Sequence, residues 1–248
     1  MRLAVAGGTG VVGRHVVRLA REAGHEPVVL SRATGVDLVT GAGLDAALAG
    51  CEVVIDVASV TTLREKEAVR FFTAATERLL AAGRGAGVRH HIALSIVGAA
   101  QAASGYYAGK AAQERLVMSS GAAWSLLRAT QFHEFAVQTA QRGAMLGMQL
   151  VPRMLSQPIA AQEVAAVLVE IAGGAPRGLD RELAGPRQER MAELVRAYLQ
   201  AEGIRRPVLE VRMPGRMGAA LAEGGVLPGP EARQGVQSFA EWLDSRAR

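Results

Sequence analysis

The first half of the chain alternates short apolar runs with stretches in which apolar residues recur every three or four positions. Apolar runs bounded by turn residues predict buried strands, and the longer period predicts helices. The predicted strands are Leu3–Ala6, Pro27–Leu30, Val36–Val39, Glu52–Val57, His91–Ser95 and Trp124–Arg128. The predicted helices are Val11–Ala23, Leu44–Leu48, Glu65–Ala82 and Ala108–Met118. Apolar strands that alternate with helices indicate a parallel sheet covered on both faces, so we expect an α/β fold with a doubly wound Rossmann sheet.

The alternation becomes irregular after about residue 130, where helices are predicted at Phe132–Gly143, Ala161–Ala172 and Met191–Ala201. We expect residues 1–130 to form the Rossmann core. Residues 131–248 are expected to form a small C-terminal substrate lobe packed on this core, within a single structural unit.

A glycine-rich loop follows the first predicted strand, with the sequence Gly7-Gly8-Thr9-Gly10-Val11-Val12-Gly13. Gly7 permits a tight turn, Gly10 lets a pyrophosphate approach the backbone, and Gly13 lets helix and strand pack closely. The helix N-terminus then offers free N–H groups to the anion. An ordinary strand-to-helix turn is the alternative, but the strand, the helix and the terminal position together favour a dinucleotide site.

The residues after the second strand bear on the choice of cofactor. An acidic residue there would bind the ribose of NAD, whereas an arginine favours the 2′-phosphate of NADP. Ser31-Arg32 stands at this point, and the next carboxylate is Asp37. The sequence therefore favours NADP over NAD, although Arg32 could also be one more arginine in an arginine-rich chain.

Tyr106 and Lys110 form a second candidate constellation, because residues four apart on a helix share one face. An ammonium near the phenol would lower its pKa and could hold the nicotinamide ribose. Such a phenol can exchange a proton with a substrate oxygen during hydride transfer. Ser95, at the end of a predicted strand, would either polarise the same oxygen or cap the following turn.

Composition excludes several classes of function. The net charge is +5, but only two of the 28 basic residues are lysines and the arginines are scattered, so we expect no nucleic-acid binding. No apolar run is long enough to span a bilayer, and the N-terminus reads as a strand rather than a signal peptide. The single cysteine, Cys51, fits a buried thiol in a reducing compartment, which predicts a cytoplasmic protein. The five histidines show no ligand spacing, so we expect no metal site.

The chain resembles the atypical and extended short-chain dehydrogenase/reductases, and within them the NmrA-like NAD(P)H-binding branch. The resemblance rests on the glycine loop, on Ser95, Tyr106 and Lys110, and on Arg128-Ala129-Thr130-Gln131-Phe132 after the last strand. It implies that Ser95, Tyr106 and Lys110 are a catalytic trio. It also implies that the cofactor contacts include Gly7, Gly10, Gly13, Arg32, Val57, Ala58 and Ser59, with Thr130, Gln131 and Phe132 near the nicotinamide. The glycine loop, the residues after the second strand and the tyrosine–lysine pair add five predicted cofactor contacts: Thr9, Val11, Val12, Ser31 and Lys110.

Three hypotheses about function follow. The first is an NADP-dependent oxidoreductase of a small carbonyl, quinone or related apolar substrate. The second is a non-catalytic NAD(P)H-sensing regulator, as in many NmrA-like proteins, and the third is an isomerase or dehydratase that retains the cofactor site. His133 would line a substrate pocket or be an interior or surface histidine of a helix. Short-chain dehydrogenases often dimerise, so a homodimer is expected by analogy.

Overall fold

The computed structural model describes residues 1–62, 64–102 and 104–246, and these residues form two compact units. Unit 1 comprises residues 1–95, 104–128 and 161–181, and unit 2 comprises residues 96–103, 129–160 and 182–248. The chain passes from unit 1 to unit 2 after residue 95, returns to unit 1 at residue 104 and enters unit 2 again after residue 128, and residues 161–181 belong to unit 1.

Unit 1 is built on a parallel sheet whose strands are ordered β5-β4-β3-β1-β2, with β9 paired to β5. These strands are β1 (Arg2–Ala6), β2 (Glu26–Leu30), β3 (Val53–Asp56), β4 (His90–Ile96), β5 (Trp124–Ala129) and β9 (Gly178–Leu179). The chain moves outward from β1 to β2 and then crosses back to β3 on the other side of β1. This reversal is the topological switch point at which doubly wound sheets bind ligands, beyond the carboxyl ends of the strands.

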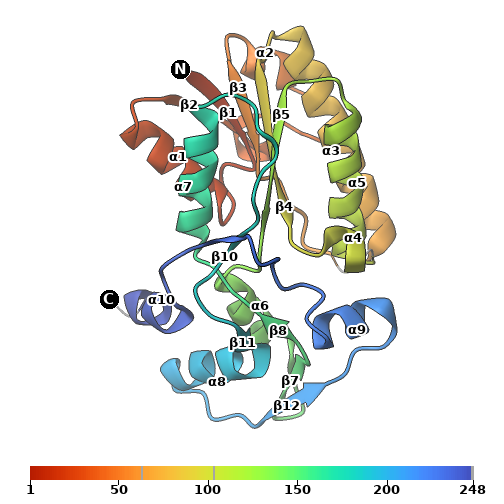
Figure 1. Ribbon diagram of the computed structural model, residues 1–248, viewed down its shortest axis with the longest axis vertical. Helices are drawn as coiled ribbons and strands as arrows, with labels where there is room; N and C mark the ends of the chain where they lie inside the picture. Colours follow the sequence, from red (N-terminus) through yellow and green to blue (C-terminus); the bar gives the residue numbers. More distant parts are fainter. Residues whose placement is uncertain (63, 103, 247–248) are drawn as a thin grey trace. The chain divides into compact units, whose positions relative to one another are not determined.

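Helices cover both faces of this sheet, as Figure 1 shows. On one face α1 (Gly13–Glu22) packs against α7 (Ala161–Ala172), and on the other α3 (Glu65–Gly85) packs against α5 (Tyr106–Ser119). The short η1 (Arg32–Thr34) and α2 (Leu44–Leu48) follow β2. Because the strands are covered on both sides, β1 and β3 bury almost every side chain, as their unbroken apolar sequences predict.

A close approach of α3 and α5 depends on Gly109. A Cβ at this position would lie 2.6 Å from Cδ2 of Phe72 and 2.9 Å from the backbone of Ala68. Only a residue without a side chain fits there, so the two helices meet backbone to side chain at this point.

The predicted strand Val36–Val39 is wrong, because this segment is a turn. The Asp37 carboxylate accepts the N–H groups of Val39 (2.8 Å) and Thr40 (3.1 Å), which removes them from any strand ladder. Val36 is still buried in the core beside α2 and α3. An apolar residue in a buried turn therefore produced the same sequence signal as a short strand.

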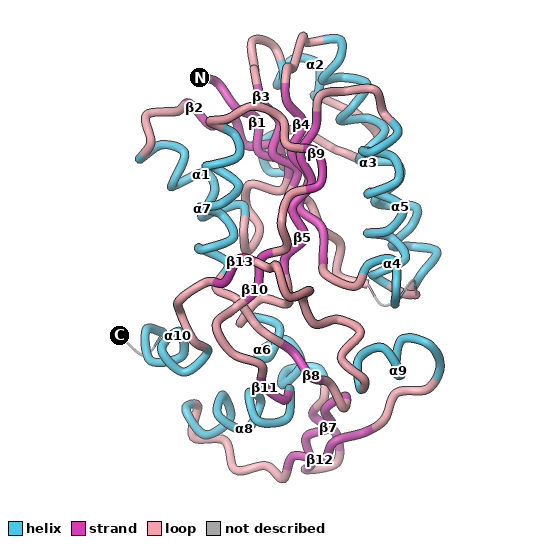
Figure 2. The backbone as a smooth tube through the Cα atoms, in the orientation of Figure 1, coloured by secondary structure: helices cyan, strands magenta, loops and turns pink. Residues whose placement is uncertain are grey.

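Unit 2 contains short strands and five helices among the described residues, drawn by type in Figure 2. Its helices are α4 (Ala99–Ala102), α6 (Glu134–Arg142), α8 (Met191–Ala201), α9 (Gly215–Ala222) and α10 (Phe239–Arg246). Its strands are β6 (Ala144–Met145), β7 (Met148–Pro152), β8 (Leu155–Ser156), β10 (Leu183–Ala184), β11 (Glu189–Arg190), β12 (Val208–Val211) and β13 (Arg233–Gln234). Helix α8 packs against α6, α10 and β7, and it forms the centre of this unit.

Candidate functional site

The glycine-rich loop joins β1 to α1 as the sequence predicts. Gly7 has a positive φ of 77°, and a Cβ there would lie 2.8 Å from Cα of Ala58. At Gly13 a Cβ would collide with the carbonyl oxygen of Gly7, whereas at Gly10 it would meet only that oxygen, at 3.2 Å. Gly7 and Gly13 therefore serve the packing of the loop, and Gly10 leaves its outer side open.

Four positions in the loop and at the start of α1 offer unpaired backbone donors. The N–H groups of Gly7, Gly8 and Gly10 donate to backbone carbonyls. In contrast, those of Thr9, Val11, Val12 and Gly13 meet no acceptor among the described residues. No acidic side chain occupies the first turn of α1. The loop is therefore a cradle of N–H groups at the positive end of a helix, which suits an anion such as a diphosphate.

The loop after β3, Val57-Ala58-Ser59, lies against this cradle, because Gly7 touches the backbone of Val57 and Ala58. Asp56, the buried last residue of β3, shapes this loop by accepting the N–H of Ala58 at 3.0 Å. β1 and β3 are neighbours in the sheet, so the two loops meet at the switch point.

Tyr106 is the first residue of α5, and its hydroxyl forms a hydrogen bond of 3.1 Å with Oγ of Ser59. The Phe72 ring packs nearly at right angles to the half-buried phenol ring, with ring centroids 5.4 Å apart. Burial raises the pKa of Tyr106 to about 12, the charge of Asp56 adds to the rise, and the Ser59 hydrogen bond opposes it. The phenol is therefore a protonated donor at neutral pH.

The side chain of Lys110 is buried and points into the interior of unit 1. Its ammonium donates to the carbonyl of Leu94 and to Oε1 of Gln113, both at 2.7 Å, and it lies 4.4 Å from the centroid of the Phe72 ring. Gln113 in turn donates to Asp56 at 2.8 Å. Burial lowers the pKa of Lys110 to about 8, although the charges of Asp56 and Glu114 oppose this. The spacing of Tyr106 and Lys110 predicts a shared helix face, but the structure shows no hydrogen bond between these two residues.

Ser95 lies near the carboxyl end of β4, and its hydroxyl is buried without a hydrogen-bond partner among the described residues. A turn-capping serine would have its hydroxyl bonded to nearby backbone. Ser95 therefore does not take the turn-capping role, and its contact with a substrate oxygen stays a prediction.

Ser31 and Arg32 follow the end of β2. Ser31 caps η1, where its N–H donates to Oγ1 of Thr34 at 3.1 Å. Arg32 is exposed, and its guanidinium makes no hydrogen bond or ion pair with another described residue. The N–H groups of Thr40 and Val39 lower the pKa of Asp37, with a smaller contribution from Arg32. Asp37, the carboxylate nearest to Arg32 in the sequence, therefore accepts hydrogen bonds from the backbone of its own turn.

The other predicted cofactor contacts, Thr130, Gln131 and Phe132, belong to unit 2. Thr130 and Gln131 are buried: Oγ1 of Thr130 donates to the carbonyl of Gln157 (2.6 Å), and Oε1 of Gln131 accepts from Ser156 (2.8 Å). Phe132 forms an isolated bridge with Ile159. Their placement near a nicotinamide stays a prediction.

His133 is completely buried and takes the interior alternative. Its Nε2 hydrogen-bonds with the carbonyl of Gln237 (3.1 Å), and its ring packs against Phe239 and Trp242. A carbonyl only accepts, so Nε2 carries the proton. Burial lowers the pKa of His133 to about 4, so the ring is neutral near pH 7.

Comparison with known proteins identifies the family to which the chain belongs. Residues 7–174 match the family model described as NAD(P)H-binding, a range that covers well over half of the chain. The chain belongs to this NAD(P)H-binding family. No curated protein matches it in sequence.

Solved structures resemble this NAD(P)H-binding protein over nearly its whole length. MoeE5 in complex with UDP-glucose and NAD is 20% identical, with a TM-score of 0.74 and coverage of 100% of this chain and 99% of its own. The NADPH-dependent quinone oxidoreductase QOR2 from Escherichia coli, complexed with NADPH, is 16% identical, with a TM-score of 0.74 and coverage of 99% and 100%. UDP-glucose 4-epimerase from Thermus thermophilus, complexed with NAD, is 18% identical, with a TM-score of 0.68 and coverage of 100% and 93%. These similarities establish the Rossmann-like fold.

The residues of the NAD(P)H-binding protein fit a dinucleotide. The unpaired N–H groups of Thr9, Val11, Val12 and Gly13 match the acceptor oxygens of a diphosphate, and Gly10 presents no Cβ to it. Among the described residues no helix is long and apolar enough to cross a bilayer, and no group of His, Cys, Asp and Glu side chains is placed to hold a metal ion.

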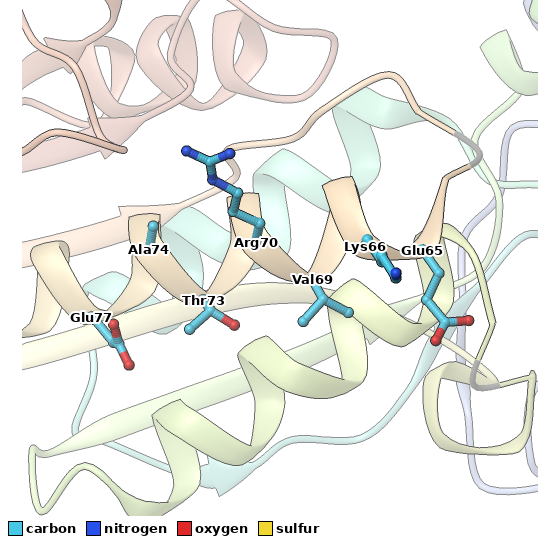
Figure 3. A pocket seen from close by; sticks show the side chains of 7 residues that line it. All are labelled: Glu65, Lys66, Val69, Arg70, Thr73, Ala74 and Glu77. Atoms are coloured by element: carbon cyan, nitrogen blue, oxygen red, sulfur yellow. The ribbon is translucent and has the colours of Figure 1, made fainter.

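A groove of about 520 Å³ lies along α3, and none of the predicted site residues lines it. Figure 3 shows its lining side chains, all of which project from this one helix. They are Glu65, Lys66, Val69, Arg70, Thr73, Ala74 and Glu77. The groove is a surface of α3, and we assign no ligand to it.

Sequence reasoning missed two polar residues of the site, Asp56 and Gln113. Both are buried and both belong to the chain of hydrogen bonds that ends at Lys110. Two signals could have found them. Asp56 is a carboxylate inside an otherwise apolar strand, and Gln113 stands three residues after Lys110, on the same helix face.

Proposed function

We propose that this protein is an NADP-dependent oxidoreductase that reduces a small carbonyl, quinone or related apolar substrate, with Tyr106 as general acid. The observation that carries the proposal is the hydrogen bond between Tyr106 and Ser59. Ser59 belongs to the loop that touches Gly7, so the phenol lies at the same end of the sheet as the N–H cradle.

A bound NADPH would supply the hydride to the substrate carbon. The protein would supply the proton, which moves from the Tyr106 hydroxyl to the substrate oxygen as negative charge develops there. A phenol with a pKa near 12 is protonated at neutral pH, so Tyr106 is in the state that a reduction requires. The unpaired hydroxyl of Ser95 is a second donor for that oxygen.

The preference for NADP rests on Arg32. Its guanidinium is exposed and unpaired at the carboxyl end of β2, and Asp37 is engaged by the backbone of its own turn. A planar cation with free donors suits a ribose 2′-phosphate. Lys110 in this proposal anchors α5 to β4 through Leu94; its contact with the nicotinamide ribose stays a prediction.

The second candidate is a non-catalytic NAD(P)H-sensing protein, and the position of Lys110 favours it. An ammonium that bonds Leu94 and Gln113 does not activate the Tyr106 phenol as the resemblance implies. Both candidates need the cradle, and only the oxidoreductase needs Tyr106.

An NADPH-oxidation screen over quinones, ketones and aldehydes distinguishes the two candidates. For an oxidoreductase, Tyr106→Phe lowers kcat about 100-fold or more while NADPH affinity stays within about threefold. Tyr107→Phe is the matched control, because it removes the neighbouring hydroxyl from the same helix turn. NADPH binding without turnover of any substrate, or turnover insensitive to Tyr106→Phe, would overturn the catalytic proposal.

A further inference from the structure

The exposed Ser59, in the loop after β3, forms a hydrogen bond with Tyr106 in the first turn of α5. Ser59 is three residues beyond the end of β3, and Tyr106 stands 47 residues later in the chain. The 3.1 Å hydrogen bond between them is the one that the described residues provide for the Tyr106 hydroxyl. Because Asp56 accepts the N–H of Ala58, the residue before Ser59 is fixed in place.

The Tyr106 ring is itself held by its neighbours. The rings of Phe72 and Tyr107 pack against it nearly at right angles, with interplanar angles of 82° and 86°. Edge-to-face contacts of this kind restrict the ring without touching the hydroxyl. The orientation of the phenol O–H is therefore left to Ser59.

Neither of the other groups expected to act with the phenol bonds to it. The Lys110 ammonium uses two of its three N–H donors on Leu94 and Gln113, and the Phe72 ring face lies beside it. The Ser95 hydroxyl is buried without a partner among the described residues. Among the described residues it is therefore Ser59, and neither Lys110 nor Ser95, that bonds the phenol.

We propose that Ser59 is a positioning residue that orients the Tyr106 hydroxyl and stabilises its ionised form. In the neutral pair either hydroxyl can donate. When the phenol gives its proton to a substrate oxygen, the Ser59 O–H turns to donate to the phenolate, and a hydrogen bond to an anion is stronger than one to a neutral oxygen. The consequence for turnover rests on the proposed function, but the effect on the phenol exists without substrate or cofactor.

The test is a titration of the Tyr106 phenol followed by fluorine NMR. All three tyrosines are replaced biosynthetically by 3,5-difluorotyrosine, whose more acidic phenol ionises at a pH where the folded chain is intact, and Tyr106→Phe assigns the signal. Ser59→Ala is expected to raise the pKa of this phenol by about one unit, because the phenolate loses its donor. Ser59→Thr retains a hydroxyl and is expected to restore the wild-type titration.

Ser95→Ala is titrated in the same way, to test whether the strand-end serine affects the phenol instead. Tyr198 in α8 is the internal reference: its pKa is expected to be the same in the wild type and in both variants. An unchanged titration in Ser59→Ala, or an equal shift in Ser95→Ala, would overturn the proposal. If an oxidoreductase activity is found, the pH profile of kcat/KM should move in Ser59→Ala in the same direction as the phenol. A shifted titration in a protein that turns over no substrate would sink the proposed function and leave the Ser59 assignment standing.

Discussion

Lys110 donates a hydrogen bond of 2.7 Å to the backbone carbonyl of Leu94, the residue before Ser95. This bond ties α5, which begins at Tyr106, to the carboxyl half of β4. The lysine that the motif singles out is thus an anchor between a helix and a strand in unit 1.

Replacing Lys110 by Met should lower the free energy of unfolding at pH 7 by about 2–4 kcal/mol, because the acceptors on Leu94 and Gln113 lose their buried donor. Burial lowers the pKa of Lys110 from 10.5 to about 8. Between these values the unfolded chain binds more protons than the folded chain, so Lys110 makes the wild type gain stability as the pH rises. Urea unfolding at several pH values measures this gain, and the stability difference between wild type and variant should grow from about pH 8 to 10. A stability difference between wild type and Lys110→Met that does not change with pH would contradict the lowered pKa of Lys110. Lys66→Met, at the exposed start of α3, is the control.

Gly10→Ala should separate cofactor binding from stability. A Cβ at Gly10 would make one tight contact, 3.2 Å from the carbonyl oxygen of Gly7, whereas one at Gly7 or Gly13 would collide with several backbone atoms. We expect NADPH affinity to fall about tenfold or more in Gly10→Ala, with a change in unfolding free energy within about 1 kcal/mol. Gly13→Ala should lower both the affinity for NADPH and the free energy of unfolding. Fluorescence titration and urea unfolding measure them, and unaltered binding in Gly10→Ala would mean that the cradle is not used.

Arg32→Ala should weaken the binding of NADPH about tenfold or more and change the binding of NADH little, because only NADPH carries the 2′-phosphate. The measurement is the dissociation constant of each cofactor. Arg14→Ala, on the neighbouring helix α1, controls for loss of positive charge. Equal losses for NADPH and NADH would contradict the assignment of Arg32.

Glu114 and Arg128 form a bidentate ion pair between α5 and β5, with contacts of 2.9 and 2.6 Å. The Glu114 side chain is only 4% exposed. Arg128→Leu should therefore cost about 3–5 kcal/mol, because it leaves a buried carboxylate uncompensated, and adding Glu114→Leu should recover much of the loss. The exposed pair of Arg64 and Glu67 is the control, for which Arg64→Ala should change the unfolding free energy little, because water screens an exposed ion pair. A double variant as unstable as Arg128→Leu would show that the pair does not act as a unit.

His133 should make the protein lose stability in weak acid. Burial lowers its pKa from 6.5 to about 4, so between these values the unfolded chain binds the additional proton and unfolding becomes easier as the pH falls. The expected contribution is about 2 kcal/mol between pH 7 and 5. Burial also lowers the pKa of His90 to about 4, so His133→Gln should remove part of the acid sensitivity and leave the share of His90. Urea unfolding at the two pH values checks this, and an unchanged sensitivity in His133→Gln would contradict it.

Helices were readily predicted from the sequence because a periodic apolar face specifies them, and buried strands because each is an unbroken apolar run. Helices α7 and α8 have the predicted bounds, and β1 to β5 all lie where apolar runs predict them. The two-residue strands of unit 2, such as β8 and β11, were not predicted, because two residues show no period and their pairing depends on distant segments.

The candidate site was predictable as a set of residue types and not as a set of contacts. The spacing of Tyr106 and Lys110 predicts a shared helix face. It does not predict which acceptors the lysine ammonium bonds, because the side chain is long and can reach several, here Leu94 and Gln113. The pairing of Ser59 with Tyr106 depends on how the loop after β3 closes, which no local pattern encodes.

Gly109 has a consequence for how far the tyrosine–lysine motif can be transferred. It stands between Tyr106 and Lys110, and its missing side chain is what admits the Phe72 ring that both residues touch. Copying only the tyrosine and the lysine onto a helix of another protein would bring neither the ring nor the close helix contact. The portable unit is a pair of helices with a glycine at their crossing.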